Sequence, residues 1–275
     1  MYKTIVINVD DGPLMESRLL AAAWLADAFG AHLVGSAVTG LSWSQYALLT
    51  SSLTTPPPGE DFQVYRDQAH ASLQRFRQQA GRLGIGSAEE RLVEDDSRHA
   101  LLLHARYADL VVTSQEPGRR GALGGIPQYI ALHSPRPVLV VPGTYAGAPI
   151  GARIVAGWDG SMQAIRALDA ALPFLARAEK VTLALADPEH EPGLHGEEPG
   201  ADMARYLARH GVKVEVACER GRAPAGEVLL AVARNAGADL MVTGAFGHSR
   251  YRELVLGGVT RILLERSPLP LLIAH

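Results

Sequence analysis

Glycine is concentrated in one short part of the chain, residues 243–260, between a strand-like apolar segment and a helix-like one. Glycine adopts positive φ angles and lets other groups approach the main chain, so this run indicates a ligand lying against the backbone. A phosphate is the expected ligand, because the first N–H groups of a helix have no partners within it. We therefore predict phosphate contacts from Gly244, Gly247, Gly257, Gly258, Val259 and Thr260.

Polar side chains in the same segment suit this chemistry. Arg250 or Arg252 would pair with phosphate charge, and the Thr260 hydroxyl would add a donor. The alternative is a tight connection whose glycines serve only turns. The chain has no G-x-x-x-x-G-K-[ST] motif, and no G-x-G-x-x-G motif follows the first strand of either half. Neither a P-loop NTPase nor a dinucleotide oxidoreductase is therefore supported.

The elements that position this loop are repeated along the chain. DLVVT at 109–113 returns as DLMVT at 239–243, SPRPVLVV at 134–141 returns as SPLPLLIA at 267–274, and TIVINVD returns as RIVAGWD. Strand-like and helix-like segments alternate, and strands that are apolar throughout are typical of a parallel sheet with both faces covered. We therefore predict two tandem doubly wound, five-stranded α/β domains, residues 1–145 and 150–275, with a seam at 142–152.

These repeats, together with a G-x2-G-x9-G spacing and an Asp-Gly-Ser turn at 159–161, resemble the universal stress protein family in its tandem two-domain form. The resemblance covers nearly the whole chain and implies Rossmann-like domains of the adenine-nucleotide alpha hydrolase type. It implies that Asp159 and the main chain around Ala186 hold adenosine, while the glycine loop and the following helix hold the phosphates. The implied cofactor is ATP with magnesium or manganese.

The chain departs from the family pattern at several positions. Gly258 stands where ATP-binding members carry Ser or Thr, and Trp158 either narrows the base site or packs in the core. In the first half Ser114 and Pro117 replace the first two glycines and the loop is shorter, so that half is predicted to be degenerate. Its Asp10 is expected to serve as a turn or cap residue.

Composition narrows the classes of partner. The net charge is −3 with both signs interspersed, which favours neither nucleic acid nor an anionic membrane as a partner. No apolar run approaches the roughly 20 residues of a membrane span, and the N-terminus reads as a strand rather than a signal sequence. We expect a cytoplasmic protein. The single cysteine, Cys218, is expected to be buried in a strand.

Two inserted segments and the scattered histidines yield no catalytic or metal site. Residues 40–60 are interpreted as a lid, an apolar-ligand surface or a loop that packs its own aromatics. Residues 187–200 contain Asp, Glu and His without a zinc spacing and read as a polar loop. His99, His104 and His133 have no nucleophile partner at a recognisable spacing.

Three functional hypotheses follow. The first is a stress-response regulator that binds ATP in its C-terminal domain and hydrolyses it slowly at most. The second is a nucleotide-free family member that holds another small or apolar ligand, and the third, least supported, is a phosphotransfer or adenylating enzyme. The apolar last strands of the halves, 134–141 and 267–274, would be exposed edges in isolation, so we predict that they meet in an intrachain pseudo-dimer. Association of whole chains as a homodimer is left open.

Overall fold

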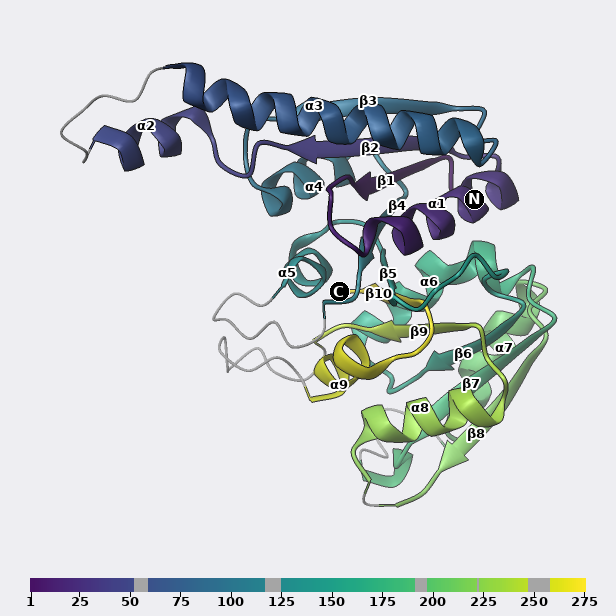
Figure 1. The fold of residues 1–275 in the computed structure, drawn as a ribbon. Coiled ribbons are helices and arrows are strands. Elements are labelled where there is room, and N and C mark those ends of the chain that lie inside the picture. The colour runs from purple at the N-terminus through teal and green to yellow at the C-terminus, as the bar shows by residue number, and fades with distance from the viewer. Residues whose placement is uncertain (52–58, 117–124, 191–196, 222, 247–257) are drawn as a thin grey trace.

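The computed structural model describes residues 1–51, 59–116, 125–190, 197–221, 223–246 and 258–275 (Figure 1). Within these ranges, no helix is both long and apolar enough to cross a bilayer. The predicted contact residues Gly247, Arg250 and Gly257 lie outside the described residues.

Each half alternates strands and helices. In the first half the elements are β1 (Thr4–Asn8), α1 (Met15–Phe29), β2 (His32–Val38), α2 (Trp43–Ser51), α3 (Gly59–Arg82), β3 (Ala88–Val93), α4 (Ser97–Ala105), β4 (Leu110–Ser114), α5 (Ile126–His133) and β5 (Val138–Val141). In the second half they are β6 (Arg153–Gly157), α6 (Met162–Leu175), β7 (Lys180–Ala186), the short 3-10 helix η1 (Pro188–His190), α7 (Ala201–Arg209), β8 (Val214–Glu219), α8 (Ala225–Asn235), β9 (Leu240–Gly244), α9 (Gly258–Arg266) and β10 (Leu271–Ala274).

The strands form one ten-stranded sheet in the order β3-β2-β1-β4-β5-β10-β9-β6-β7-β8. Neighbours within each half are parallel, whereas β5 and β10 pair antiparallel with Leu272 opposite Leu139. The predicted pairing of the two last strands is therefore present within the chain. It removes two apolar edges that would otherwise be open to aggregation.

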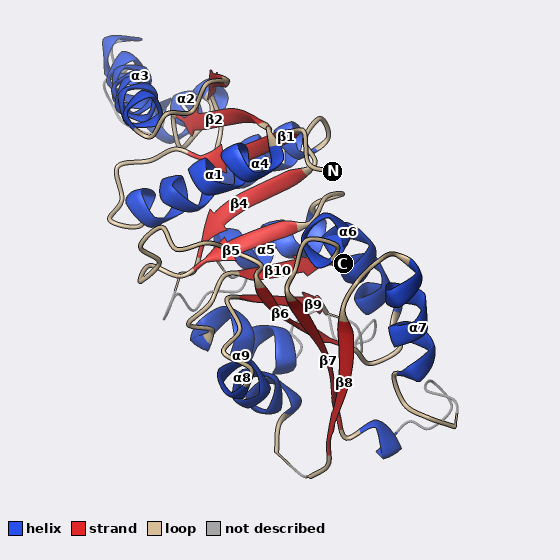
Figure 2. Ribbon diagram, turned by 90° about the vertical axis from the view of Figure 1, so that its right-hand side faces the viewer, coloured by secondary structure: helices blue, strands red, loops and turns tan. Residues whose placement is uncertain are grey.

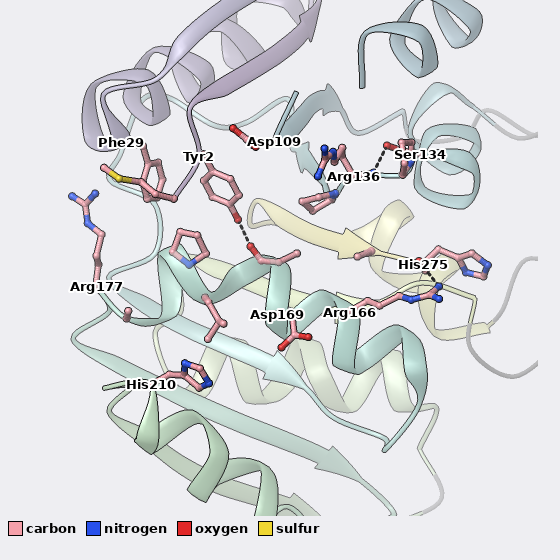
Figure 3. Close-up of a pocket in the computed structure, with 18 residues that line it drawn as sticks. Tyr2, Phe29, Asp109, Ser134, Arg136, Arg166, Asp169, Arg177, His210 and His275 are labelled. Carbon is pink, nitrogen blue, oxygen red and sulfur yellow. Dashed lines mark hydrogen bonds between the residues drawn. The ribbon is translucent and has the colours of Figure 1, made fainter. Parts of the chain in front are cut away.

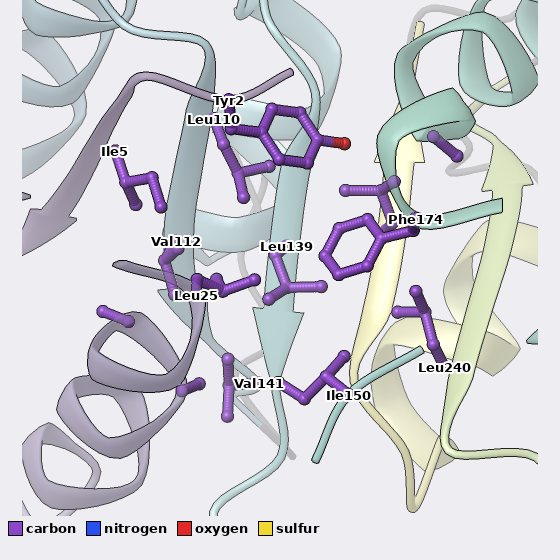
Figure 4. Close-up of a cluster of buried hydrophobic side chains, with 14 of the residues drawn as sticks. Tyr2, Ile5, Leu25, Leu110, Val112, Leu139, Val141, Ile150, Phe174 and Leu240 are labelled. Carbon is purple, nitrogen blue, oxygen red and sulfur yellow. The ribbon is translucent and has the colours of Figure 1, made fainter. Parts of the chain in front are cut away.

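Helices cover both faces of the sheet, as the apolar strands predict (Figure 2). One face carries α1, α3, α6 and α7, and the other carries α4, α5, α8 and α9. On the first face the core is continuous across the junction, where Tyr2, Phe29 and Phe174 contact one another with ring centroids 5.1 to 5.5 Å apart. Figure 4 shows Leu139 and Ile150 in the same cluster, between the two halves.

An aspartate directly before the fourth strand of each half accepts hydrogen bonds from the main chain at the start of the first strand. Asp109 accepts the N–H groups of Lys3 and Thr4 at 2.7 and 3.0 Å. In the second half, Asp239 accepts the N–H groups of Gly151 and Ala152 at 2.7 and 3.0 Å. Each contact satisfies main-chain donors at the amino end of a strand, and the first and fourth strands pair in the same register in both halves.

The structure corrects the prediction for Cys218 and refines the interpretation of the 40–60 insert. Cys218 is exposed, not buried, because β8 is an outer strand of the sheet and none of its residues is buried. The 40–60 insert contributes α2 and the start of α3, which extend beyond the sheet (Figure 1). Tyr46 is buried against Phe62 of α3, while Trp43 remains 49% exposed and contacts both rings, so the aromatics of the insert pack against each other and against α3.

Candidate functional site

The strand order reverses once within each half, between β1 and β4 and between β6 and β9. Open α/β sheets bind ligands at such a switch point, beyond the carboxyl ends of the strands. A cavity of about 170 Å³ lies there in the second half. It is bounded by the ends of β6, β7 and β9 and by the first turns of α6, α8 and α9.

Six of the nine residues predicted from the sequence line this one cavity: Asp159, Ala186, Gly244, Gly258, Val259 and Thr260. They come from four separated parts of the second half, and the sheet topology brings them together. Gly247, Arg250 and Gly257 fall outside the described residues.

The Asp-Gly-Ser turn both starts α6 and exposes a carboxylate at the cavity. Asp159 Oδ1 accepts the Ser161 N–H at 3.0 Å, and Ser161 Oγ caps the helix by accepting the Ala164 N–H at 3.1 Å. Gly160 permits the turn with a φ of 75°. Among the described lining residues, Asp159 has the only ionisable side chain.

Gly244 is required by packing rather than by a ligand alone. A β-carbon built on it would lie 2.6 Å from the main-chain nitrogen of Ala164 and 2.6 Å from the carbonyl carbon of Gln163. The close approach predicted from the sequence is therefore real, but the group that approaches is the first turn of α6.

The first residues of α9 include an exposed glycine and a threonine that is hydrogen-bonded to the segment after β9. Gly258 is exposed, and no atom of the described residues lies within 4 Å of a β-carbon built on it. Thr260 is 4% exposed, and its Oγ1 accepts the N–H of Phe246 at 3.1 Å. The hydroxyl that the sequence assigns to a phosphate thus also joins the end of β9 to α9.

Apolar side chains form the walls of the cavity. Trp158 is half-buried, packs against the core and also lines the cavity with Leu229 and Phe246. Thr243 Oγ1 is buried in this wall and has no partner among the described residues. A ligand here would meet apolar surface, a carboxylate and a helix N-terminus.

The corresponding region of the first half is built differently. Asp10 accepts the Gly12 N–H at 2.8 Å, the expected turn role, and also pairs with Arg18 at 2.7 Å. The Arg18 side chain is only 4% exposed and donates to Ser114 Oγ at 2.8 Å; burial lowers its pKa. Ala167 occupies the equivalent position in the second half, so no arginine stands there on α6. The spacing of residues in the sequence gave no sign that Arg18 would be buried beside Asp10.

A carboxylate lies at the N-terminus of α5, where a phosphate is predicted in the second half. Glu116 Oε2 is 2.5 Å from the place that a β-carbon on Gly125 would take, and Gly125 is the N-cap residue. The repeat pairs Glu116 with Phe246. A helix N-terminus favours negative charge, so Glu116 supplies it internally.

One buried polar pair was not anticipated. His104 Nδ1 lies 3.1 Å from Ser36 Oγ, and both residues are buried, at 7% and 0% exposure. Because Ser36 has no access to solvent, the pair is structural. Among the described residues, no group of His, Cys, Asp and Glu is arranged to hold a metal ion.

Comparisons with known proteins agree with this architecture. The sequence profile of the universal stress protein family matches residues 1–142 and 152–275, so the chain belongs to the universal stress protein family. Universal stress protein Slr1230 from Synechocystis is 26% identical over 298 residues, covering 98% of this chain and 99% of that protein. Family membership assigns the chain to the stress response.

Solved structures of the family share the whole two-domain arrangement. A universal stress protein from Archaeoglobus fulgidus superposes with a TM-score of 0.77 at 16% identity, covering 98% of this chain and 95% of the other. One from Pseudomonas aeruginosa gives a TM-score of 0.63 at 16% identity, covering 99% and 93%. At these identities the likeness concerns the fold alone.

Proposed function

We propose that this protein is a cytoplasmic stress-response regulator that binds one adenine nucleotide, ATP with magnesium or manganese, in its second half. The observation that carries the proposal is the convergence of six sequence-predicted residues on one cavity at the switch point of β6 and β9. No catalytic residue is assigned, and any hydrolysis is expected to be slow.

Each wall of the cavity has a role in this proposal. The apolar surface of Trp158 and Leu229 receives the base, and Asp159 accepts a hydrogen bond from the ribose. The N–H groups of Gly258, Val259 and Thr260, at the start of α9, receive the phosphates. A volume of about 170 Å³ is below the usual range for ligand pockets, so the described walls enclose only the nucleoside end.

A second candidate function rests on the same walls. Their apolar character and the single ionisable side chain favour a small, mostly apolar ligand over a triphosphate. In that case the exposed N-terminus of α9 contributes little to affinity, which separates the two proposals experimentally.

Mass spectrometry of ligand released from the purified protein, before and after incubation with ATP and magnesium, tests the choice. Adenine nucleotide retained through gel filtration supports the nucleotide proposal. A lipid or other apolar compound that ATP fails to displace supports the alternative.

Gly258→Ser gives a sharper test, with Gly258→Ala as the matched control. Space is available at this position, and a hydroxyl would supply the phosphate contact that glycine lacks. A hydrogen bond to a charged group contributes about 1.5–3 kcal/mol, so the ATP dissociation constant should fall tenfold or more in Gly258→Ser alone. Equal affinities in the two variants would argue against phosphate at α9.

A further inference from the structure

A second hollow lies between the halves, on the helical face of the sheet that carries α6. It is a groove of about 840 Å³, within the range of small-molecule sites. Tyr2 and Phe29 of the first half (Figure 3) and Leu172 and Pro173 of α6 give the groove an apolar part beside its charged residues. It shares no described lining residue with the cavity at Asp159.

The pseudo-symmetry of the chain shows what fills the corresponding place beside α1. The repeat that pairs Asp10 with Asp159 also pairs Leu20 on α1 with Asp169 on α6, which lines the groove. Over α1 lies the chain's own linker: a β-carbon on Gly147 would contact Leu20 at 3.9 Å.

Tyr145 of that linker packs against the core. Its hydroxyl donates to the main-chain oxygen of Ala148 at 2.5 Å, and burial raises its pKa to about 12. The place over α1 is therefore covered by the chain's own linker and its Tyr145 ring. The described residues leave the corresponding groove over α6 open.

Charge on the groove over α6 is not internally balanced. Arg136 precedes β5 and Arg166 and Arg177 lie on or just after α6, so both halves supply cations (Figure 3). Across the described residues, none of these three guanidinium groups forms an ion pair with a side-chain carboxylate. Arg166 and Arg177 donate to main-chain oxygens of His275 and Ala28.

The two carboxylates of the lining have other partners. Asp109 accepts two main-chain N–H groups, and Asp169 accepts the Tyr206 hydroxyl at 3.1 Å. The Arg136 side chain has no partner in the described part of the chain, so its five donors face solvent. An anion entering the groove would therefore meet unoccupied donors on Arg136.

We propose that this groove binds a small organic anion in which an apolar or aromatic body carries one phosphate, sulfonate or carboxylate group. The body lies on Tyr2, Leu172 and Pro173, and the anionic group is held by Arg136 and Arg166. The site is separate from the proposed nucleotide site and does not depend on it.

Fluorescence titration with 8-anilinonaphthalene-1-sulfonate tests this site, with uncharged N-phenyl-1-naphthylamine as the matched probe. We expect saturable sulfonate binding whose dissociation constant rises about tenfold in Arg136→Gln combined with Arg166→Gln. Binding of the uncharged probe should be unchanged. Arg234→Gln, an exposed arginine on α8 on the other face of the sheet, should alter neither.

A second variant, in which binding is expected to become tighter, distinguishes a specific effect on the groove from a general loss of structure. Asp169→Asn removes a negative charge from the groove and should tighten sulfonate binding a fewfold. The inference is overturned if the double arginine variant binds the sulfonate as wild type does.

Discussion

Replacing Gly244 with alanine should destabilise the fold even without any ligand. The added β-carbon would lie 2.6 Å from two main-chain atoms of α6, whereas carbon contacts settle near 3.5–4.0 Å. The first turn of α6 or the end of β9 must therefore move by roughly 1 Å. Overpacking of this kind costs about 1–3 kcal/mol, which for a chain of this size lowers Tm by about 2–12 °C.

Gly258→Ala is the matched control, because no atom in the described part of the chain lies within 4 Å of the β-carbon that this change adds. It should be neutral or stabilise the protein by up to about 1 kcal/mol, since alanine reduces the entropy of the unfolded chain. Thermal unfolding followed by circular dichroism, in nucleotide-free buffer, compares the two. Equal Tm values for Gly244→Ala and wild type would refute the packing argument and return Gly244 to a purely ligand-related role.

Two further predictions concern the buried polar groups. Burial lowers the pKa of His104, with Arg91 adding to the effect, so the unfolded chain binds a proton more readily and stability should fall as pH drops below about 6.5. Urea unfolding at pH 8 and pH 5.5 should show a smaller acid loss in His104→Gln than in wild type, and an identical loss would contradict the assignment. Tyr2→Phe removes a 2.6 Å hydrogen bond to the main-chain oxygen of Ala170 at the junction of the halves, and should cost about 1 kcal/mol in the same assay. No change in the urea midpoint would show that the hydroxyl contributes nothing there.

The repeats made most of the architecture predictable from sequence. Uniformly apolar strands indicated a sheet covered on both faces, and the two apolar last strands indicated their pairing as β5 and β10. The convergence of Asp159 and Ala186 with the start of α9 followed from the order of strands, because carboxyl ends of parallel strands share one edge.

Features that depend on contacts between distant residues were not predictable. Arg18 lies beside Asp10 because α1 points it inward, and the Glu116 carboxylate lies beside Gly125 at the start of α5. Gly244 was interpreted through a ligand, and its close contact with α6 had no signal in the sequence. The expectation for Cys218 failed because a strand's position at the edge of a sheet is set by topology and not by its own residues.

Calorimetric titration with ATP and magnesium, on wild type and on Gly258→Asp, tests the central claim most directly. An aspartate at the exposed start of α9 should preserve the fold, since an acidic residue suits a helix N-terminus, yet it places there the negative charge that Glu116 supplies at α5. We expect micromolar binding with a stoichiometry near one per chain in wild type and no measurable binding in the variant. A stoichiometry of two, or unchanged affinity in Gly258→Asp, would contradict it.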